Sequence, residues 1–158
     1  MSSEGVYTFA VEIEIKCSPE KFFDVYADHV TILPQVLPHT FKSTTVVKGD
    51  GKSVGSVVDW EYSVVPPTFE TARQTIEAID DENMILIKRF YGGDLGRKFD
   101  LFRATLKAYK KENKNYVKWS IDTKKTHGEI PDPHDYMVFI EKFTKEFDTS
   151  LVSGKISA

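Results

Sequence analysis

Apolar and polar residues alternate through most of the chain. Between Tyr7 and Cys17, apolar side chains occupy every second position as far as Ile15, which predicts a half-buried strand with one dry face. From about Phe41 the same pattern continues to residue 125 and predicts six further strands, near residues 41–48, 54–64, 69–79, 83–91, 97–110 and 115–125. The connections are short and rich in Gly, Pro, Asn and Asp, so successive strands are expected to be antiparallel neighbours.

Helical signals interrupt this pattern after the first strand and follow it at the C-terminal end. Ser18 is a capping hydroxyl followed by Pro19 at the first helical position, which predicts a short helix. Pro34 and Pro38 then allow only a broken helical stretch before the second strand.

The last helix is predicted to start with Asp132 as its cap and to run for about 20 residues, or roughly 30 Å, to a stop near Gly154. Its apolar residues recur at helical spacing along one stripe: Tyr136, Phe139, Ile140, Phe143, Phe147 and Leu151. A large sheet with polar alternation needs one face covered, and only this helix is long enough to cover it. The sequence therefore predicts a single α+β domain over residues 1–158, with seven antiparallel strands curled around the helix and a cavity between them.

The glycine-rich stretch "KGDGKSVGSV", residues 48–57, invites comparison with phosphate-binding loops. A P-loop needs glycine five residues before the Gly-Lys pair, and that position is Val46. The residues that follow alternate as a strand, so no helix N-terminus is available to hold an anion. We interpret the stretch as a hairpin connection.

Composition excludes several classes of partner. The formal net charge is −3, and the lysines are mixed with acids throughout, so we expect no nucleic-acid binding. Cys17 is the single cysteine, which favours a reducing, cytoplasmic location. No apolar run approaches the ~20 residues that span a bilayer, and no two histidines have the i, i+4 spacing of a metal site. We expect no membrane association, metal or cofactor, and a monomer or weak dimer.

Several segments resemble the plant major latex protein-like family, part of the superfamily of the birch pollen allergen and the class-ten pathogenesis-related proteins. They are "LPQVLPHTFKSTTVVKGDGKSVGSV", "EAIDDEN", "YGGDL", "VKWSIDTKK" and "EIPDPHDYMVF". The resemblance runs from about Val11 to Leu151. It implies a helix-grip fold with two short helices after the first strand.

The resemblance also implies an apolar cavity for a small hydrophobic ligand: a terpenoid, steroid, flavonoid, alkaloid or hormone-like molecule. Most such proteins are carriers, with roles in defence or specialised metabolism, and a minority are cofactor-free enzymes. The segments "SVVPPTFETARQT" and residues 90–97 depart from the usual family pattern near the implied cavity mouth. Ligand identity is therefore not carried over.

We expect the inward apolar positions to bind the ligand, namely Phe9, Val11, Tyr26, Trp60, Ile85, Ile87, Phe90, Phe99, Trp119, Tyr136, Phe139, Ile140 and Phe143. For Phe139 and Phe143, plain core packing is an equally weighted alternative, and for Phe147 it is the preferred one. The polar atoms of Trp60 and Tyr62 either address a ligand or find an internal partner.

Three residues are candidates for proton transfer or polar contact with a substrate: His39, Tyr62 and Arg89. His39 is alternatively a loop residue with a backbone partner, and Arg89 is alternatively a surface charge. His29 and His134 are expected at the surface or at helix ends.

Three functions remain open from the sequence: a carrier of a small apolar molecule, a cofactor-free cyclase or isomerase in the same cavity, and an interaction protein with a filled core. The carrier is the preferred hypothesis.

Overall fold

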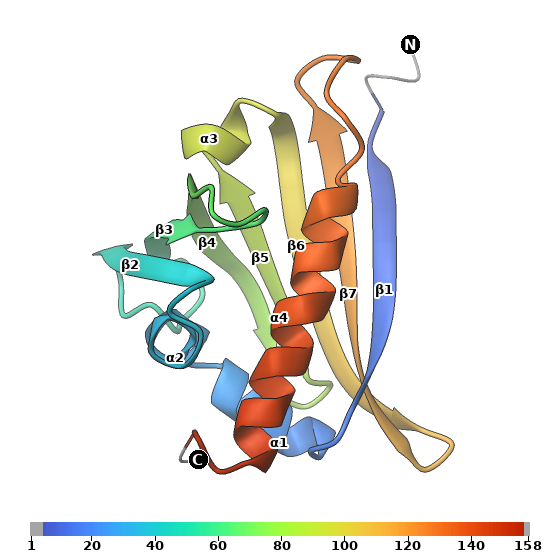
Figure 1. The fold of residues 1–158 in the computed structure, drawn as a ribbon. Helices are drawn as coiled ribbons and strands as arrows, with labels where there is room; N and C mark the ends of the chain where they lie inside the picture. The colour runs from blue at the N-terminus through green and yellow to red at the C-terminus, as the bar shows by residue number, and fades with distance from the viewer. Residues whose placement is uncertain (1–4, 157–158) are drawn as a thin grey trace.

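The computed structural model describes residues 5–156 and shows a curved antiparallel sheet wrapped around one long helix (Figure 1). The seven strands are β1 (Tyr7–Ile15), β2 (Phe41–Lys48), β3 (Val57–Tyr62), β4 (Glu70–Asp80), β5 (Ile85–Tyr91), β6 (Phe99–Lys111) and β7 (Lys114–Lys125). Their order across the sheet is β1-β7-β6-β5-β4-β3-β2, with every pair antiparallel. The predicted helix-grip architecture is confirmed.

Four helices accompany the sheet: α1 (Pro19–Tyr26), α2 (His29–Val36), α3 (Gly93–Gly96) and α4 (His134–Val152). Helix α4 lies across the concave face of the sheet, and α1 and α2 close the end where α4 finishes (Figure 1). The single turn α3 lies toward the opposite end, in a connection that the sequence predicted only as a turn.

The helix termini follow the capping chemistry of the sequence with one difference. Ser18 Oγ accepts a hydrogen bond from the Lys21 amide at 3.1 Å, as expected of the cap of α1. Helix α4 begins one residue later than predicted, because Pro133 has a ψ of 40° and stands at the cap position itself. At the other end Gly154 has a φ of +78°, the left-handed conformation that ends helices.

The glycine-rich loop between β2 and β3 is built around the Asp50 carboxylate. This group accepts hydrogen bonds from the amides of Lys52 and Ser53, both at 2.8 Å, and from Ser56 Oγ at 3.1 Å. These hydrogen bonds hold the pKa of Asp50 well below its usual value. The loop amides that an anion would need are thus directed at a carboxylate, which repels phosphate.

The core lies between the concave face of the sheet and α4. On β6 a register shift lies between Phe99 and Leu101, and Phe102 is buried beyond it. This bulge keeps both phenylalanines on the inner face.

Candidate functional site

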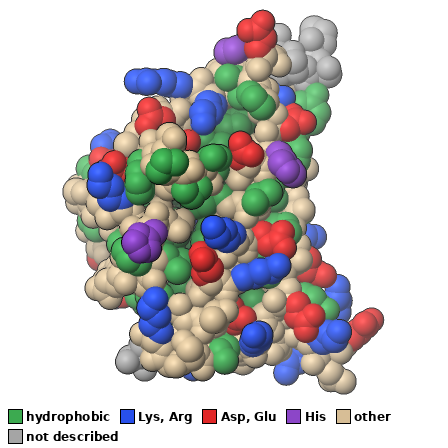
Figure 2. Space-filling model, in the orientation of Figure 1, with side chains coloured by type: hydrophobic (Ala, Val, Ile, Leu, Met, Phe, Trp, Pro, Cys, Tyr) green, Lys and Arg blue, Asp and Glu red, His purple; other side chains and the backbone are tan. Residues whose placement is uncertain are grey.

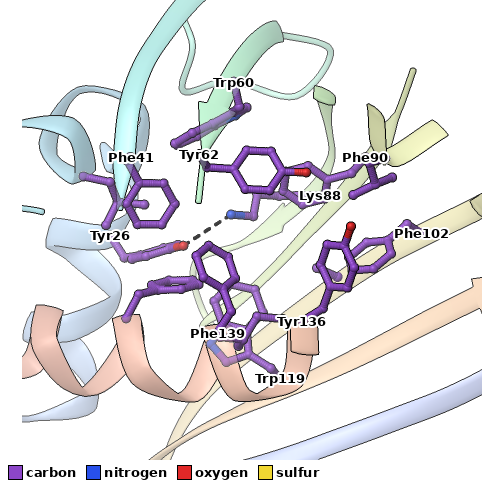
Figure 3. A pocket seen from close by; sticks show the side chains of 15 residues that line it. Tyr26, Phe41, Trp60, Tyr62, Lys88, Phe90, Phe102, Trp119, Tyr136 and Phe139 are labelled. Atoms are coloured by element: carbon purple, nitrogen blue, oxygen red, sulfur yellow. Dashed lines mark hydrogen bonds between the residues drawn. The ribbon is translucent and has the colours of Figure 1, made fainter. Parts of the chain in front are cut away.

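A cavity of about 70 Å³ lies between α4 and the concave face of the sheet (Figure 3). Apart from Lys88, its wall is apolar or aromatic. The wall consists of Tyr26, Leu33, Phe41, Trp60, Tyr62, Lys88, Phe90, Leu95, Phe102, Ala104, Trp119, Tyr136, Phe139, Ile140 and Phe143. In the space-filling view, apolar side chains lie in a recess between α4 and the strands β2 and β3, with charged side chains around it (Figure 2).

Helix α4 contributes to the cavity with only its first half. Tyr136, Phe139, Ile140 and Phe143 line the wall. Phe147, two turns from Ile140, is fully buried against the rings of α1 and does not reach the cavity. Of the two alternatives weighed for each phenylalanine, Phe139 and Phe143 take the cavity position and Phe147 takes the core position.

Lys88 is the one charged side chain on the wall. It comes from the inner face of β5, is 3 % exposed, and its Nζ donates a hydrogen bond to Tyr26 Oη at 3.3 Å (Figure 3). The same Nζ lies 5.0 Å from the ring centre of Tyr26, 5.5 Å from that of Phe90 and 5.3 Å from that of Trp119. Burial lowers the pKa of Lys88 to about 7, because a buried ammonium loses its hydration.

A buried histidine supports this part of the wall from behind. His29 is fully buried and stacks between Tyr26 and Trp60, with ring centres 5.0 and 6.0 Å away. Its Nδ1 pairs with the Tyr26 carbonyl at 3.0 Å and its Nε2 with Gln74 Oε1 at 3.4 Å. Burial, and secondly the charge of Lys88, hold the pKa of His29 well below its usual value. His29 is the first residue of α2, at a helix end as one of its two alternatives predicts, but it does not lie at the surface, because α2 turns this residue into the core.

A carboxylate network joins the cavity wall to the first turn of α4. Glu70 Oε2 accepts hydrogen bonds from Tyr62 Oη and from Tyr136 Oη, each at 2.6 Å. Lys98 Nζ lies 3.3 Å from Glu70 Oε1 and 3.2 Å from Tyr136 Oη. Burial, together with the Glu70 carboxylate, raises the pKa of both tyrosines. Both phenols are therefore neutral hydrogen-bond donors at physiological pH.

Two buried polar atoms have no partner among residues 5–156 and lie close to this site. They are Trp60 Nε1 and Gln74 Nε2. Trp119 Nε1, in contrast, donates to Thr144 Oγ1 at 3.0 Å. Of the two alternatives for Trp60 and Tyr62, Tyr62 has the internal partner and Trp60 retains an unused donor on the cavity wall.

A larger hollow of about 540 Å³ lies on the outer face of the sheet, beside β3 and β4. Most of its lining residues are polar, and Arg73 Nε there lies 2.7 Å from Asp59 Oδ1. We take the smaller inner cavity as the candidate site, since ligand sites are mostly apolar and enclosed with few polar groups.

Eight of the thirteen predicted ligand-binding residues lie on the cavity wall: Tyr26, Trp60, Phe90, Trp119, Tyr136, Phe139, Ile140 and Phe143. Five do not line it: Phe9, Val11, Ile85, Ile87 and Phe99.

The five residues away from the wall have three explanations. Phe9 and Val11 belong to β1, which contributes nothing to the wall because the cavity lies on the other side of α4, against β2 to β7. Phe99 packs edge-on against Phe102, with ring centres 5.4 Å apart, and sits behind the wall. Ile85 and Ile87 fall on the outer face of β5, because Lys88 takes the inner face and neighbouring residues alternate.

Of the three candidates for proton transfer, only Tyr62 reaches the wall. His39 is exposed in the connection before β2. Arg89 shares the outer face of β5 with Ile87 and is half-buried there, as its surface alternative predicts.

Sequence reasoning missed six wall residues: Leu33, Phe41, Lys88, Leu95, Phe102 and Ala104. For Lys88 a signal existed, since Leu86 and Phe90 flank it at the same parity and mark the buried face. The lysine itself favoured placing this face outward, because lysines are rarely buried without a partner.

Residues 5–156 contain no group of three or more His, Cys, Asp or Glu side chains placed to hold a metal ion. Within the same range, no helix combines the length and the apolar character that a bilayer crossing requires.

Comparisons with known proteins agree with this geometry. The model of the pathogenesis-related protein Bet v 1 family matches residues 4–154. MLP-like protein 423 of Arabidopsis thaliana is 32 % identical over 142 residues, covering 90 % of this chain and 92 % of its own. Major latex protein 146 of Papaver somniferum is 29 % identical, with 91 % and 90 % covered. The crystal structure of ginseng major latex-like protein 151 from Panax ginseng superposes with a TM-score of 0.85 at 25 % identity, covering 91 % of this chain and 96 % of that one.

Proposed function

The chain belongs to the Bet v 1 family, whose members typically bind hydrophobic ligands, and we propose that it binds a small apolar molecule in the cavity beneath α4. The observation that carries the proposal is an almost wholly apolar wall that encloses one free indole donor, Trp60 Nε1. Ligand burial would drive binding at about 25 cal/mol per Å², less the cost of ordering.

Cavity size sets an order among the ligand classes. An apolar cavity of about 150 Å³ accepts benzene, and the cavity here is about 70 Å³. A terpenoid or larger ligand therefore requires a wall side chain to move. Phe139 is the candidate, because it is only half-buried. We expect compact terpenoid-sized molecules to bind before steroids or flavonoids.

The two tryptophans of the chain provide a direct readout, since both lie on the cavity wall. Titration with a panel of small terpenoids should quench tryptophan fluorescence in a saturable manner. Ala104→Leu, which extends a side chain into the cavity, should abolish the quench. Thr105 lies on the outer face of β6, so the matched variant Thr105→Leu should leave the quench intact. A saturable quench that survives Ala104→Leu would place binding elsewhere.

The alternative function is a cofactor-free cyclase or isomerase of plant specialised metabolism. It is supported by the phenol of Tyr62, the one predicted catalytic residue on the wall, which lies 2.6 Å from Glu70 Oε2. Such a pair can hold or deliver one proton. On a panel of iridoid and alkaloid precursors, Tyr62→Phe should stop turnover while the tryptophan quench persists. Turnover that is unchanged in Tyr62→Phe would remove this assignment.

The cytoplasmic location and a role in defence or specialised metabolism stay predictions. The first rests on the single buried cysteine and the second on the family resemblance.

A further inference from the structure

Lys88 is held in the cavity without the partner that a buried ammonium normally requires. It forms no salt bridge within residues 5–156, and its one hydrogen bond is to the phenol of Tyr26. Buried lysines are usually paired with a carboxylate, because an isolated charge in an apolar site loses its hydration. The ring faces of Tyr26, Phe90 and Trp119 offset part of that loss. Burying this amine therefore lowers the stability of the fold, which suggests that Lys88 has a role other than stabilising it.

The environment of Lys88 keeps much of the amine unprotonated. Its pKa is lowered to about 7 by burial, so that free amine is available at neutral pH. The nearby titratable groups do not change this. Burial raises the pKa of Tyr26 and lowers that of His29, which leaves both neutral near pH 7. A desolvated lysine of this kind is a nucleophile toward carbonyl carbon.

We propose that Lys88 forms an imine with a small apolar aldehyde bound in the cavity. This proposal rests on the proposed function, that the cavity binds small apolar molecules, and adds that the ligand carries an aldehyde group. The amine lone pair forms a C–N bond with the carbonyl carbon, and a proton moves from nitrogen to oxygen to give a carbinolamine. Loss of water then leaves a C=N bond. The step needs no oxidant or reductant, and Tyr26 Oη is placed 3.3 Å from Nζ to relay the proton.

The wall favours an aldehyde over a carboxylate. Aromatic faces carry negative charge density, and three of them surround Nζ. They stabilise an ammonium or an iminium but oppose a carboxylate brought to the same point. An aldehyde is neutral until it reacts, so its entry does not require a second buried charge.

Reductive trapping tests the proposal. The whole chain is incubated with hexanal at pH 7 and sodium cyanoborohydride, followed by intact mass measurement and peptide mapping. We expect one hexyl adduct located at Lys88, at least tenfold enriched over any surface lysine, because surface amines with pKa about 10.4 are almost fully protonated at this pH. The trapping rate at Lys88 should rise between pH 6 and 8, whereas that of surface lysines should rise only toward pH 10.

The variants separate chemistry from binding. Lys88→Met and Lys88→Arg should lose the adduct, whereas Lys107→Met, an exposed lysine of β6, should keep it. Hexanol, which cannot form an imine, should quench tryptophan fluorescence in the unaltered chain and in Lys107→Met.

Three outcomes would overturn the inference. If hexanol and hexanal both quench but no adduct forms at Lys88, the imine is wrong and the binding function stands. If neither quenches, the proposed function itself fails, and adducts on surface lysines do not rescue it. If hexanoate binds more tightly than hexanol, and this preference is lost in Lys88→Met but kept in Lys88→Arg, Lys88 is an anion partner instead.

Discussion

The two ends of the contact between α4 and the sheet are built differently from the same kinds of residue. At the C-terminal end, Phe147 is fully buried, with its ring 5.1 Å from Phe22 and 5.3 Å from Tyr26. Asp148 closes this end by accepting hydrogen bonds from the amides of Lys16 at 2.8 Å and Cys17 at 3.1 Å. The rings of Phe22, Tyr26 and Phe147 are each at most 1 % exposed there.

At the N-terminal end, rings of similar size surround a void. Phe139 and Tyr136 stand across the cavity from Tyr62 and Phe90 (Figure 3). The carboxylate at this end, Glu70, bonds to side-chain hydroxyls rather than to backbone amides. Hydroxyls can rotate to other partners, whereas backbone amides cannot, so this end can change its packing at lower cost.

The difference shows why one helix can both hold the fold and open onto a ligand. Stability comes from the end where α1 fills the space between helix and sheet. The other end faces β3 and β5 with no helix inserted, and the sheet curvature leaves space there. The predictions below test this division.

Phe147→Ala should have the largest effect, a loss of about 4 kcal/mol in the free energy of unfolding, because it opens a cavity in a filled core. Urea denaturation monitored by circular dichroism measures the loss. A cost below that of Phe139→Ala would contradict the division into a filled and a hollow end.

Lys88→Met should raise the free energy of unfolding at neutral pH by a few kcal/mol. The pKa of Lys88 is about 7 in the folded chain and about 10.4 in the unfolded chain. Above about pH 10.4 the lysine is neutral in both the folded and the unfolded state, so its burial carries no charge penalty. As the pH falls from about 10.4 to about 7, the unfolded chain takes up a proton that the folded chain does not, and the free energy of unfolding of the unaltered chain decreases relative to that of the variant. Below about pH 7 this difference stays constant. Thermal unfolding of both proteins between pH 6 and 10 tests this, and a difference that does not change with pH would refute it.

Asp148→Ala should lower the free energy of unfolding by about 2 kcal/mol, since it leaves the amides of Lys16 and Cys17 without their acceptor. Asp148→Asn keeps one acceptor oxygen and should recover part of the loss. Glu70→Ala at the hollow end is the matched comparison and should cost less in the same urea titration. The reverse order would show that the Glu70 network, and not the Asp148 contact, anchors α4.

Phe139→Ala should have the smallest effect on stability, about 1 kcal/mol, because the ring is only half-buried and borders a void already present. The larger cavity should improve the affinity for bulky ligands, measured by tryptophan quenching. Unchanged affinity for bulky ligands together with a large stability loss would show that Phe139 is a core residue.

Sequence reasoning performed best where local chemistry decides the outcome. Alternation located all seven strands to within a few residues. Reasoning failed on β5 and α2, where Lys88 and His29 are buried against the usual preference of their residue types. In both cases most of the stabilising contacts come from rings on other elements, which the local pattern does not specify.

By itself the sequence determined the strands, the capped C-terminal helix with its aromatic stripe, and a glycine-rich loop that is a turn and not a phosphate site. These depend on neighbours within a few positions, and alternation or capping expresses them directly. Only the tertiary structure decided where the packing stops and a cavity remains, and that Lys88 faces it without a carboxylate partner. Both depend on how closely side chains from nine separate helices and strands approach one another, a distance that no local pattern specifies.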